Sequence, residues 1–191
     1  MIRVLIADDH PIIRRGLRDI VGAEPDLEVA GEAGNAVEAL TALRAGQFDV
    51  VLMDITMPGR SGLEALKDIR VEFPTLPVLM LSIHPEDQYA VRALKAGASG
   101  YLTKESAPEE LVGAIQRVVR GGRYVSSALA ERLAAEIGGA ERPDEPHTAL
   151  SDREFEVLVL IGKGRGVSQI ASDLSLSVKT VSTYRTRILE K

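Results

Sequence analysis

The stretch VVLMDITMPG, residues 50–59, contains the pattern that decides the fold. Four apolar residues run directly into Asp54, and the turn pair Pro58-Gly59 follows. A short apolar run bounded by turn signals is typical of a strand buried on both faces of a parallel sheet. Such a strand places its last residue at the carboxyl edge, where open α/β sheets bind ligands. A buried carboxylate there is costly unless it caps a helix, is paired or binds a metal.

A second stretch, RVLIADDHP at residues 3–11, ends its apolar run in Asp8 and Asp9. If the two strands are parallel neighbours, these acids meet Asp54 at one edge. Like charges repel, so such a cluster indicates a cation, and oxygen ligands favour a hard ion such as Mg²⁺. His10 could be a further metal ligand or a residue of the first helical turn, and the helix that follows favours the second interpretation.

Composition limits the class of protein. With 191 residues the chain is long enough for one full domain and a small second one. The absence of Cys excludes disulfides, thiolate metal sites and a Cys nucleophile. No apolar run approaches the roughly 18 residues of a membrane span, and the N-terminus leads directly into a strand without a signal peptide. We therefore expect a cytoplasmic protein that does not contact a membrane.

The net charge of −5 is distributed unevenly. Residues 147–191 contain seven Lys and Arg side chains against five acids, so the remainder of the chain carries all of the excess negative charge. A mildly basic end on an acidic body indicates nucleic-acid contact at that end only.

Strand-like and helix-like segments alternate from residue 1 to 121. The predicted strands are 4–7, 27–32, 50–53, 78–81 and 100–102, and the predicted helices are 12–21, 36–45, 62–73, 86–96 and 108–120. Five such βα units predict a parallel sheet with helices on both faces. The simplest arrangement is a doubly wound, flavodoxin-like α/β fold with strand order 2-1-3-4-5, in which strands one and three meet at the switch point.

Two later strand ends add polar groups. Ser82 follows residues 78–81, and Lys104 follows the strand that contains Tyr101. Taken singly, Ser82 could cap a helix, Lys104 could be a solvated surface charge, and Tyr101 could be half-buried packing. Because both polar groups occur at successive strand ends, we expect Lys104 to pair with Asp54 or with an anion on it.

This set of residues, with the loop DITMPGRSG at 54–62, resembles the receiver domain of two-component response regulators. The resemblance covers residues 1–121 and is carried by Asp8, Asp9, Asp54, Ser82, Tyr101 and Lys104. It implies that Asp54 accepts a phosphoryl group from a sensor histidine kinase. It also implies that Mg²⁺ is held by Asp9, Asp54 and the main-chain carbonyl of Thr56, with Asp8 assisting.

The same resemblance assigns the remaining roles. Ser82 would hydrogen-bond a phosphoryl oxygen, Lys104 would pair with the phosphoryl group, and Ser82 and Tyr101 would act as the switch. Independently of the resemblance, Thr56 and His84 lie two residues past Asp54 and Ser82, so we expect both to flank the path of an attacking water. The chain would then not be an enzyme in the ordinary sense, since the receiver would catalyse only its own phosphoryl transfer and dephosphorylation.

Residues 122–148 are predicted to connect two domains. Gly121-Gly122 ends the preceding helix, and Ser126 or Ser127 can cap a short amphipathic helix over 128–137. The stretch GGAERPDEPHT, residues 138–148, is polar and contains Gly and Pro. It is typical of a flexible, exposed linker.

Residues 149–191 are predicted to be a small helical domain with helices at 152–162, 167–174 and 178–190. Ser151 and Glu154 have the spacing of a capping box. Two helices joined by a short turn, the second with a polar outer face, indicate a helix-turn-helix. The expected core consists of Leu158, Ile161, Ile170, Leu174, Val181 and Ile188.

This segment closely resembles the LuxR-type domain of NarL/FixJ regulators. The resemblance implies that the helix at 178–190 enters the major groove of double-stranded DNA. Side chains expected to face base edges are Ser182, Thr183 and Thr186. Side chains expected to bind phosphates are Lys179, Thr180, Arg185 and Arg187. The family pattern continues into a fourth helix that assists dimerisation, and we expect that final helix to be absent because the sequence ends at Lys191.

The sequence thus predicts a phosphorylation-activated transcription regulator that forms a homodimer when phosphorylated. One rival is an Asp-nucleophile phosphatase, but those proteins resemble DxDx[TV], and Thr56 stands at the second Asp position. Another rival is a DNA-binding protein with a degenerate, phosphorylation-independent receiver. The complete set of acids with Lys104 opposes it.

Overall fold

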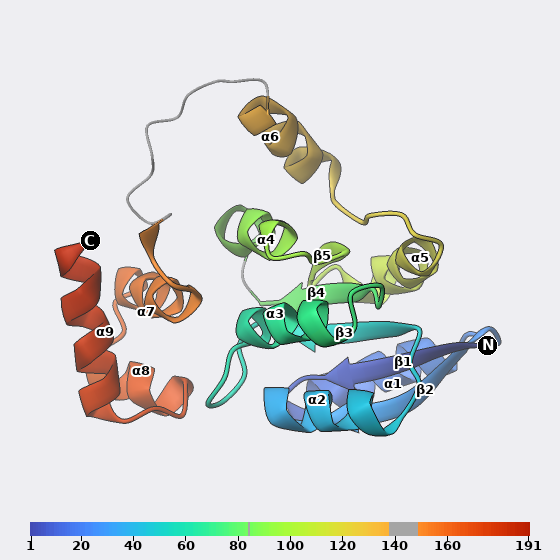
Figure 1. Cartoon of the computed structure of the whole chain (residues 1–191), viewed down its shortest axis with the longest axis horizontal. Coiled ribbons are helices and arrows are strands. Elements are labelled where there is room, and N and C mark those ends of the chain that lie inside the picture. Colours follow the sequence, from blue (N-terminus) through green and yellow to red (C-terminus); the bar gives the residue numbers. More distant parts are fainter. Residues whose placement is uncertain (84, 138–148) are drawn as a thin grey trace. The chain divides into compact units, whose positions relative to one another are not determined.

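The computed structural model describes residues 1–83, 85–137 and 149–191, which form two compact units, Met1–Ala135 and Glu136–Lys191 (Figure 1). Each unit has its own hydrophobic core. The predicted linker at 138–148 and the side chain of His84 lie outside the described residues. Within those ranges, none of the helices combines the length and apolar character that a membrane span requires.

The first unit is built on a sheet of parallel strands. Their bounds are β1 Ile2–Ala7, β2 Leu27–Ala33, β3 Val50–Asp54, β4 Val78–Ser82 and β5 Gly100–Thr103. The order β2-β1-β3-β4-β5 confirms the predicted flavodoxin-like topology. In the register, Ala7 pairs with Met53 and Ser82 pairs with Thr103, so the polar residues at the strand ends share one edge.

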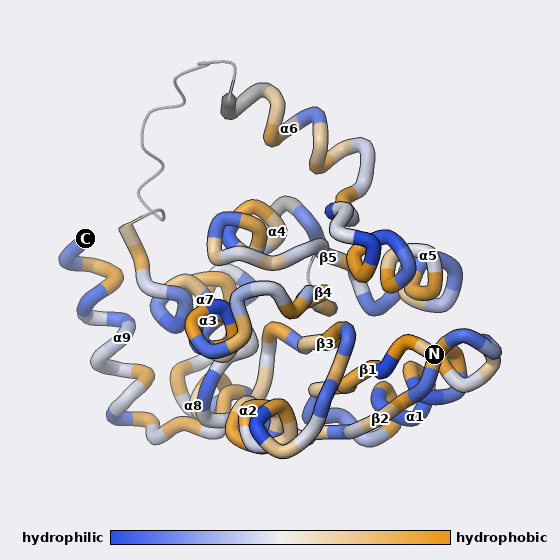
Figure 2. The backbone as a smooth tube through the Cα atoms, turned by 45° about the vertical axis from the view of Figure 1, so that its right-hand side comes forward, coloured by the Kyte–Doolittle hydropathy of each residue, from blue (hydrophilic) through white to orange (hydrophobic). Residues whose placement is uncertain are grey.

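Helices cover both faces of this sheet. Their bounds are α1 Pro11–Gly22, α2 Ala36–Ala45, α3 Gly62–Glu72, α4 Glu86–Lys95 and α5 Ala107–Val119. Alternate strand residues, among them Ile6, Leu52 and Leu81, form a fully buried cluster with α1 and α5. The intervening residues point to the other face, which α2, α3 and α4 cover (Figure 1). Figure 2 shows the strands as mostly hydrophobic and the helices as mixed, as expected for this layering.

Local sequence signals explain where the helices begin. Asn35 accepts a hydrogen bond from the Glu38 N–H at 2.9 Å, which confirms it as the N-cap of α2. Ser61 and Glu64 form a capping box at α3. The first residue of α3, Gly62, lies against the end of β3: a Cβ at Gly62 would be 1.9 Å from the Asp54 carbonyl oxygen. Only Gly allows that approach, which sets where Asp54 sits.

The second unit contains α7 Asp152–Gly162, α8 Val167–Asp173 and α9 Val178–Glu190, preceded in the chain by α6, Ser127–Ile137. The predicted capping box of Ser151 and Glu154 is confirmed. The buried core comprises Val157, Ile170, Ala171, Leu174 and Val181, with Ile161 and Ile188 packed against it. The prediction was wrong for Leu158, which is only half-buried and not in this cluster. One residue advances a helix by about 100°, so Val157 takes the inward position instead.

Candidate functional site

Three carboxylates meet at the carboxyl edge of β1 and β3. Asp8 and Asp54 are 0% and 2% exposed, whereas Asp9 is half-buried. Carboxylate oxygens of these three residues and a ring nitrogen of His10 lie within 4.8 Å of one another. The convergence expected from adjacent parallel strands is therefore present, and its carboxylate oxygens are the donors that a hard divalent cation takes.

Lys104 is the counter-ion of this cluster. It follows β5, and its Nζ lies 2.7 Å from Asp54 Oδ2 and 2.6 Å from Asp8 Oδ2. Its side chain is 8% exposed, so these ion pairs are largely shielded from water. The structure thus brings Lys104 to Asp54, as the sequence indicates, and adds a second contact to Asp8. One cation facing two buried acids leaves negative charge uncompensated.

The electrostatics of the site follow from that imbalance. Burial raises the pKa of Asp54 to about 7, and the charge of Asp8 adds to the rise while Lys104 opposes it. Burial lowers the pKa of Lys104, but the carboxylates of Asp54 and Asp8 outweigh it, so that this pKa is raised overall. Asp54 is therefore a carboxylate whose negative charge is poorly stabilised until a further cation joins the cluster.

The other predicted pocket residues surround Asp54. The Thr56 N–H donates to Asp54 Oδ1 at 3.3 Å, and the Thr56 hydroxyl is buried without a hydrogen-bond partner in the described part of the chain. Ser82 is buried at the end of β4, and its carbonyl accepts a hydrogen bond from the Lys104 N–H at 2.8 Å. Tyr101 is completely buried in β5. Ser82 and Lys104 thus lie at the ends of two neighbouring strands, beside Asp54.

His10 is placed differently from a buried ligand. It is the N-cap residue of α1, its side chain is 61% exposed, and its Nδ1 lies 2.7 Å from Asp9 Oδ1. It borders the acid cluster from the solvent side. The position at the start of the helix agrees with the interpretation that the sequence favours.

Two residues that support the site escaped the sequence analysis. Arg14 donates from Nη1 to the Asp8 carbonyl oxygen at 2.6 Å, and its Nε lies 3.5 Å from Glu32. Gly62 permits the close approach of α3 to Asp54. The sequence could have indicated the role of Gly62. Gly is a poor helix former, so a Gly in the first turn of a helix indicates a close approach that a side chain would prevent. Arg14 carried no comparable signal.

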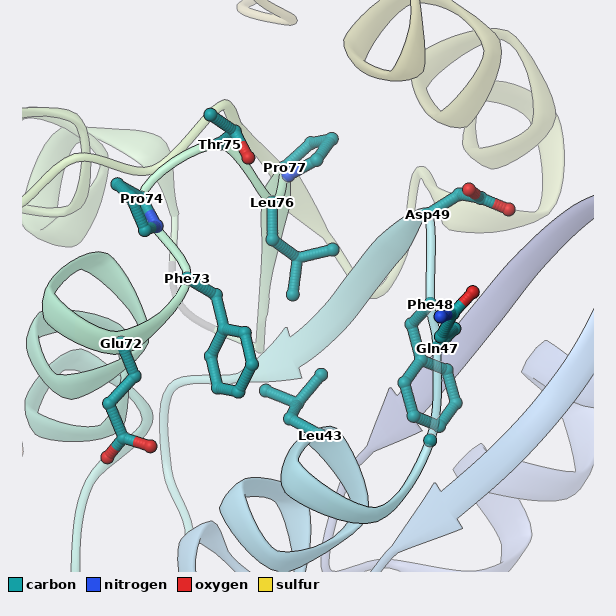
Figure 3. A pocket seen from close by; sticks show the side chains of 11 residues that line it. Leu43, Gln47, Phe48, Asp49, Glu72, Phe73, Pro74, Thr75, Leu76 and Pro77 are labelled. Carbon is teal, nitrogen blue, oxygen red and sulfur yellow. The ribbon is translucent and has the colours of Figure 1, made fainter.

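A separate hollow of about 560 Å³ lies at the opposite edge of the sheet, between the C-terminal ends of α2 and α3 (Figure 3). Leu43 and Phe73 line it on one side and Phe48 on the other. None of the predicted site residues lines it.

The predicted DNA-contacting side chains lie along α9. Exposed positions are Lys179, Ser182, Thr183, Arg185, Thr186 and Arg187. Each residue turns an α-helix by about 100°. One face of α9 packs on the core through Val181, Tyr184 and Ile188. The opposite face carries Lys179, Ser182, Thr183 and Thr186. Thr180 is half-buried, and its hydroxyl lies 2.7 Å from that of the N-cap residue Ser177. Its main role in this structure is at the start of the helix.

Comparison with known proteins identifies both units. Residues 4–116 match the family described as response regulator receiver domain, and residues 148–191 match the family described as bacterial regulatory proteins, luxR family. The chain is a response regulator of the NarL/FixJ family. Response regulator UvrY of Escherichia coli is 40% identical over 191 residues, covering all of this chain and 88% of UvrY. Response regulator GacA of Pseudomonas aeruginosa is 39% identical over 191 residues, covering all of this chain and 89% of GacA.

Solved structures of response regulators show the same fold. RcsB from Salmonella enterica serovar Typhimurium, bound to the promoter rprA in the presence of the phosphomimetic BeF3⁻, has a TM-score of 0.66 at 27% identity. The match covers 99% of this chain and 91% of that one. The family of this chain therefore combines a receiver with a LuxR-type DNA-binding domain.

Proposed function

We propose that Asp54 is the phosphoacceptor of this response regulator and that a sensor histidine kinase is the donor. The observation that carries the proposal is the environment of Asp54: a buried carboxylate at a strand end, 2.7 Å from Lys104 and beside two further acids. A lone carboxylate is a weak nucleophile toward phosphorus, because anions repel one another. Lys104 supplies part of the charge neutralisation that this transfer needs, and a cation held by the acid cluster would supply the rest.

We infer that Mg²⁺ is the cofactor. Asp8, Asp9 and Asp54 fit it through their clustered oxygens, and the Thr56 carbonyl would complete the set. The ion would neutralise charge on the transferring phosphoryl group. The raised pKa of Asp54 supports this assignment, since a divalent cation stabilises the ionised form that attacks.

The residues of the chain then divide the work. Asp54 Oδ forms a bond to phosphorus as the bond from phosphorus to the donor nitrogen breaks. Lys104 leaves the free carboxylate and pairs with the new phosphoryl oxygens, while the Ser82 hydroxyl donates to one of them. The phosphoryl group adds a charge of about −1.5 to −2. Tyr101 lies in β5, the strand that leads to Lys104, and would change its position when Lys104 moves. Beyond its own transfer and dephosphorylation, the receiver catalyses nothing.

We propose that residues 1–121 act as the receiver, 122–148 as the linker and 149–191 as the DNA-binding domain. The outer face of α9 would lie in the major groove, with Ser182, Thr183 and Thr186 toward base edges. Lys179, Thr180, Arg185 and Arg187 would bind phosphates, although the cap role of Thr180 leaves it the weakest of the four. Phosphorylation would favour a homodimer that binds double-stranded DNA in the cytoplasm.

Phosphorylation with a small acyl phosphate tests the proposal. The chain should be labelled in the presence of Mg²⁺ and should not be labelled after chelation, and Asp54→Asn should abolish labelling. The labelled sample should elute as a dimer on sizing and shift DNA more strongly than the unlabelled sample. Labelling of Asp54→Asn at the level of the unmodified chain would contradict the assignment.

A further inference from the structure

Asp8 is held in place by both its backbone and its side chain. Its N–H donates to the Ala33 carbonyl at the end of β2 at 3.1 Å, and its carbonyl accepts from Arg14 Nη1 at 2.6 Å. Its carboxylate is also engaged, because Oδ1 accepts from the His10 N–H at 2.8 Å and Oδ2 lies 2.6 Å from Lys104 Nζ. Each polar group of Asp8 therefore has a partner.

Asp9 is the acid of the cluster that remains available to a cation. Its Oδ1 is buried and accepts no hydrogen bond within the described part of the chain, although the His10 ring nitrogen lies 2.7 Å away. The carbonyl of Asp8 belongs to the peptide unit that joins Asp8 to Asp9. Because Arg14 holds that peptide unit, it limits the backbone angles at Asp9 and hence the direction in which the Asp9 carboxylate points. Arg14 thus acts on the acid cluster through the backbone.

Arg14 is itself fixed between two acceptors. It reaches back to the end of β1 because only residues 8–10 connect β1 to α1. Its Nε lies 3.5 Å from Glu32 Oε2 near the end of β2, and Arg18 Nη1 lies 3.0 Å from the other carboxylate oxygen of Glu32. The Arg14 guanidinium therefore contacts Glu32 through one nitrogen and the Asp8 carbonyl through another. A planar guanidinium can serve both acceptors at once, whereas the ammonium of Lys is a single point charge.

We propose that Arg14 is a positioning residue for the magnesium site, which fixes the peptide unit between Asp8 and Asp9 so that the Asp9 carboxylate meets Asp54. The inference rests on the proposed function. The charge of Arg14 acts in the opposite direction, because a cation near an acid cluster repels a second cation. Glu32 offsets that charge, so the positioning effect is the larger of the two. Loss of Arg14 therefore weakens Mg²⁺ binding, whereas the charge alone would require it to strengthen binding.

Calorimetric titration of the full chain with Mg²⁺ tests this assignment without phosphorylation. Arg14→Gln should weaken Mg²⁺ binding about tenfold, close to the lower end of the effect expected for a lost hydrogen bond from a charged group. Arg14→Lys should weaken it about threefold, because Lys keeps the charge but serves only one of the two acceptors. Arg15→Gln is the matched control, since Arg15 is the next residue of α1, carries the same charge and is exposed. Its Mg²⁺ affinity should stay within about twofold of that of the unmodified chain.

Labelling by an acyl phosphate separates positioning from a general loss of structure. In Arg14→Gln, the Mg²⁺ concentration that gives the half-maximal rate should rise about tenfold. The rate at saturating Mg²⁺ should stay within about twofold of that of the unmodified chain, because the bound ion then draws Asp9 into place. A rate that stays low at saturating Mg²⁺ would indicate a merely structural role and overturn the inference.

The two proposals fail in different ways. If the unmodified chain binds Mg²⁺ and Arg14→Gln binds it equally well or more tightly, the positioning role is refuted while the phosphoacceptor assignment of Asp54 stands. If the unmodified chain binds no Mg²⁺ at all, the cofactor assignment of the proposed function fails and the role of Arg14 fails with it.

Discussion

Replacing Asp54 by Asn should stabilise the receiver when no divalent cation is present, and the gain should grow with pH. The native pKa of Asp54 is raised from 3.8 to about 7, mainly by burial. Because the pKa of Asp54 is higher in the native state than in the unfolded state, the native state binds this proton more tightly. The free energy of unfolding therefore falls as the pH rises from the unfolded pKa of 3.8 to the native pKa of about 7. Asn stays neutral at every pH and so avoids that loss. Lys104 keeps Asp8 as a partner at 2.6 Å.

The size of the effect follows from the shift. Each pKa unit is worth about 1.4 kcal/mol, so a shift of about three units gives about 4 kcal/mol at pH 8. At pH 5, only about one unit above the unfolded pKa, the same calculation gives about 1.5 kcal/mol. Because Asp54 is buried, solvent screening does not reduce these values appreciably.

Native-state amide exchange of β3 and β4, measured in a chelator between pH 5 and 8, reports the free energy of opening the receiver alone. The Asn variant should be protected more strongly, with a gain that increases by about 2–3 kcal/mol over this range. Asp19→Asn, at an exposed position of α1, is the control and should show no such trend. A gain that does not change with pH, or an Asn variant that is less stable at pH 8, would refute the electrostatic argument.

Three further predictions concern the cation, the backbone and the DNA face. Lys104→Gln should tighten Mg²⁺ binding about tenfold by calorimetry, because it removes a positive charge from the acid cluster. Gly62→Ala should slow phosphorylation of Asp54 by acyl phosphate at least tenfold, whereas Gly113→Ala, where a Cβ meets open space, should not. Lys179→Gln should weaken DNA binding on all sequences and reduce the salt-dependence slope by about 1 in a titration.

The strand order and the acid cluster were predictable from the sequence for a shared physical reason. A parallel strand that is buried on both faces must be apolar until its carboxyl end, so the first polar residue marks both the boundary and the edge of the sheet. Residues 4–8 and 50–54 follow this rule. This rule did not predict the contact of Lys104 with Asp8. The position of the ammonium group on a long, flexible side chain depends on the charges around it and not on the alternation of residues along a strand.

The contacts of residues 123–129 with the receiver were not predictable, because these residues carry no periodic signal. Tyr124 joins the sheet through one residue, too short for the alternation that identifies a strand. Gly121-Gly122 marks the end of α5 correctly, but a helix end is compatible with a free connector or with a docked one. Only the spatial neighbours of Ser126 and Tyr124, namely Glu86 and Glu110, distinguish the two.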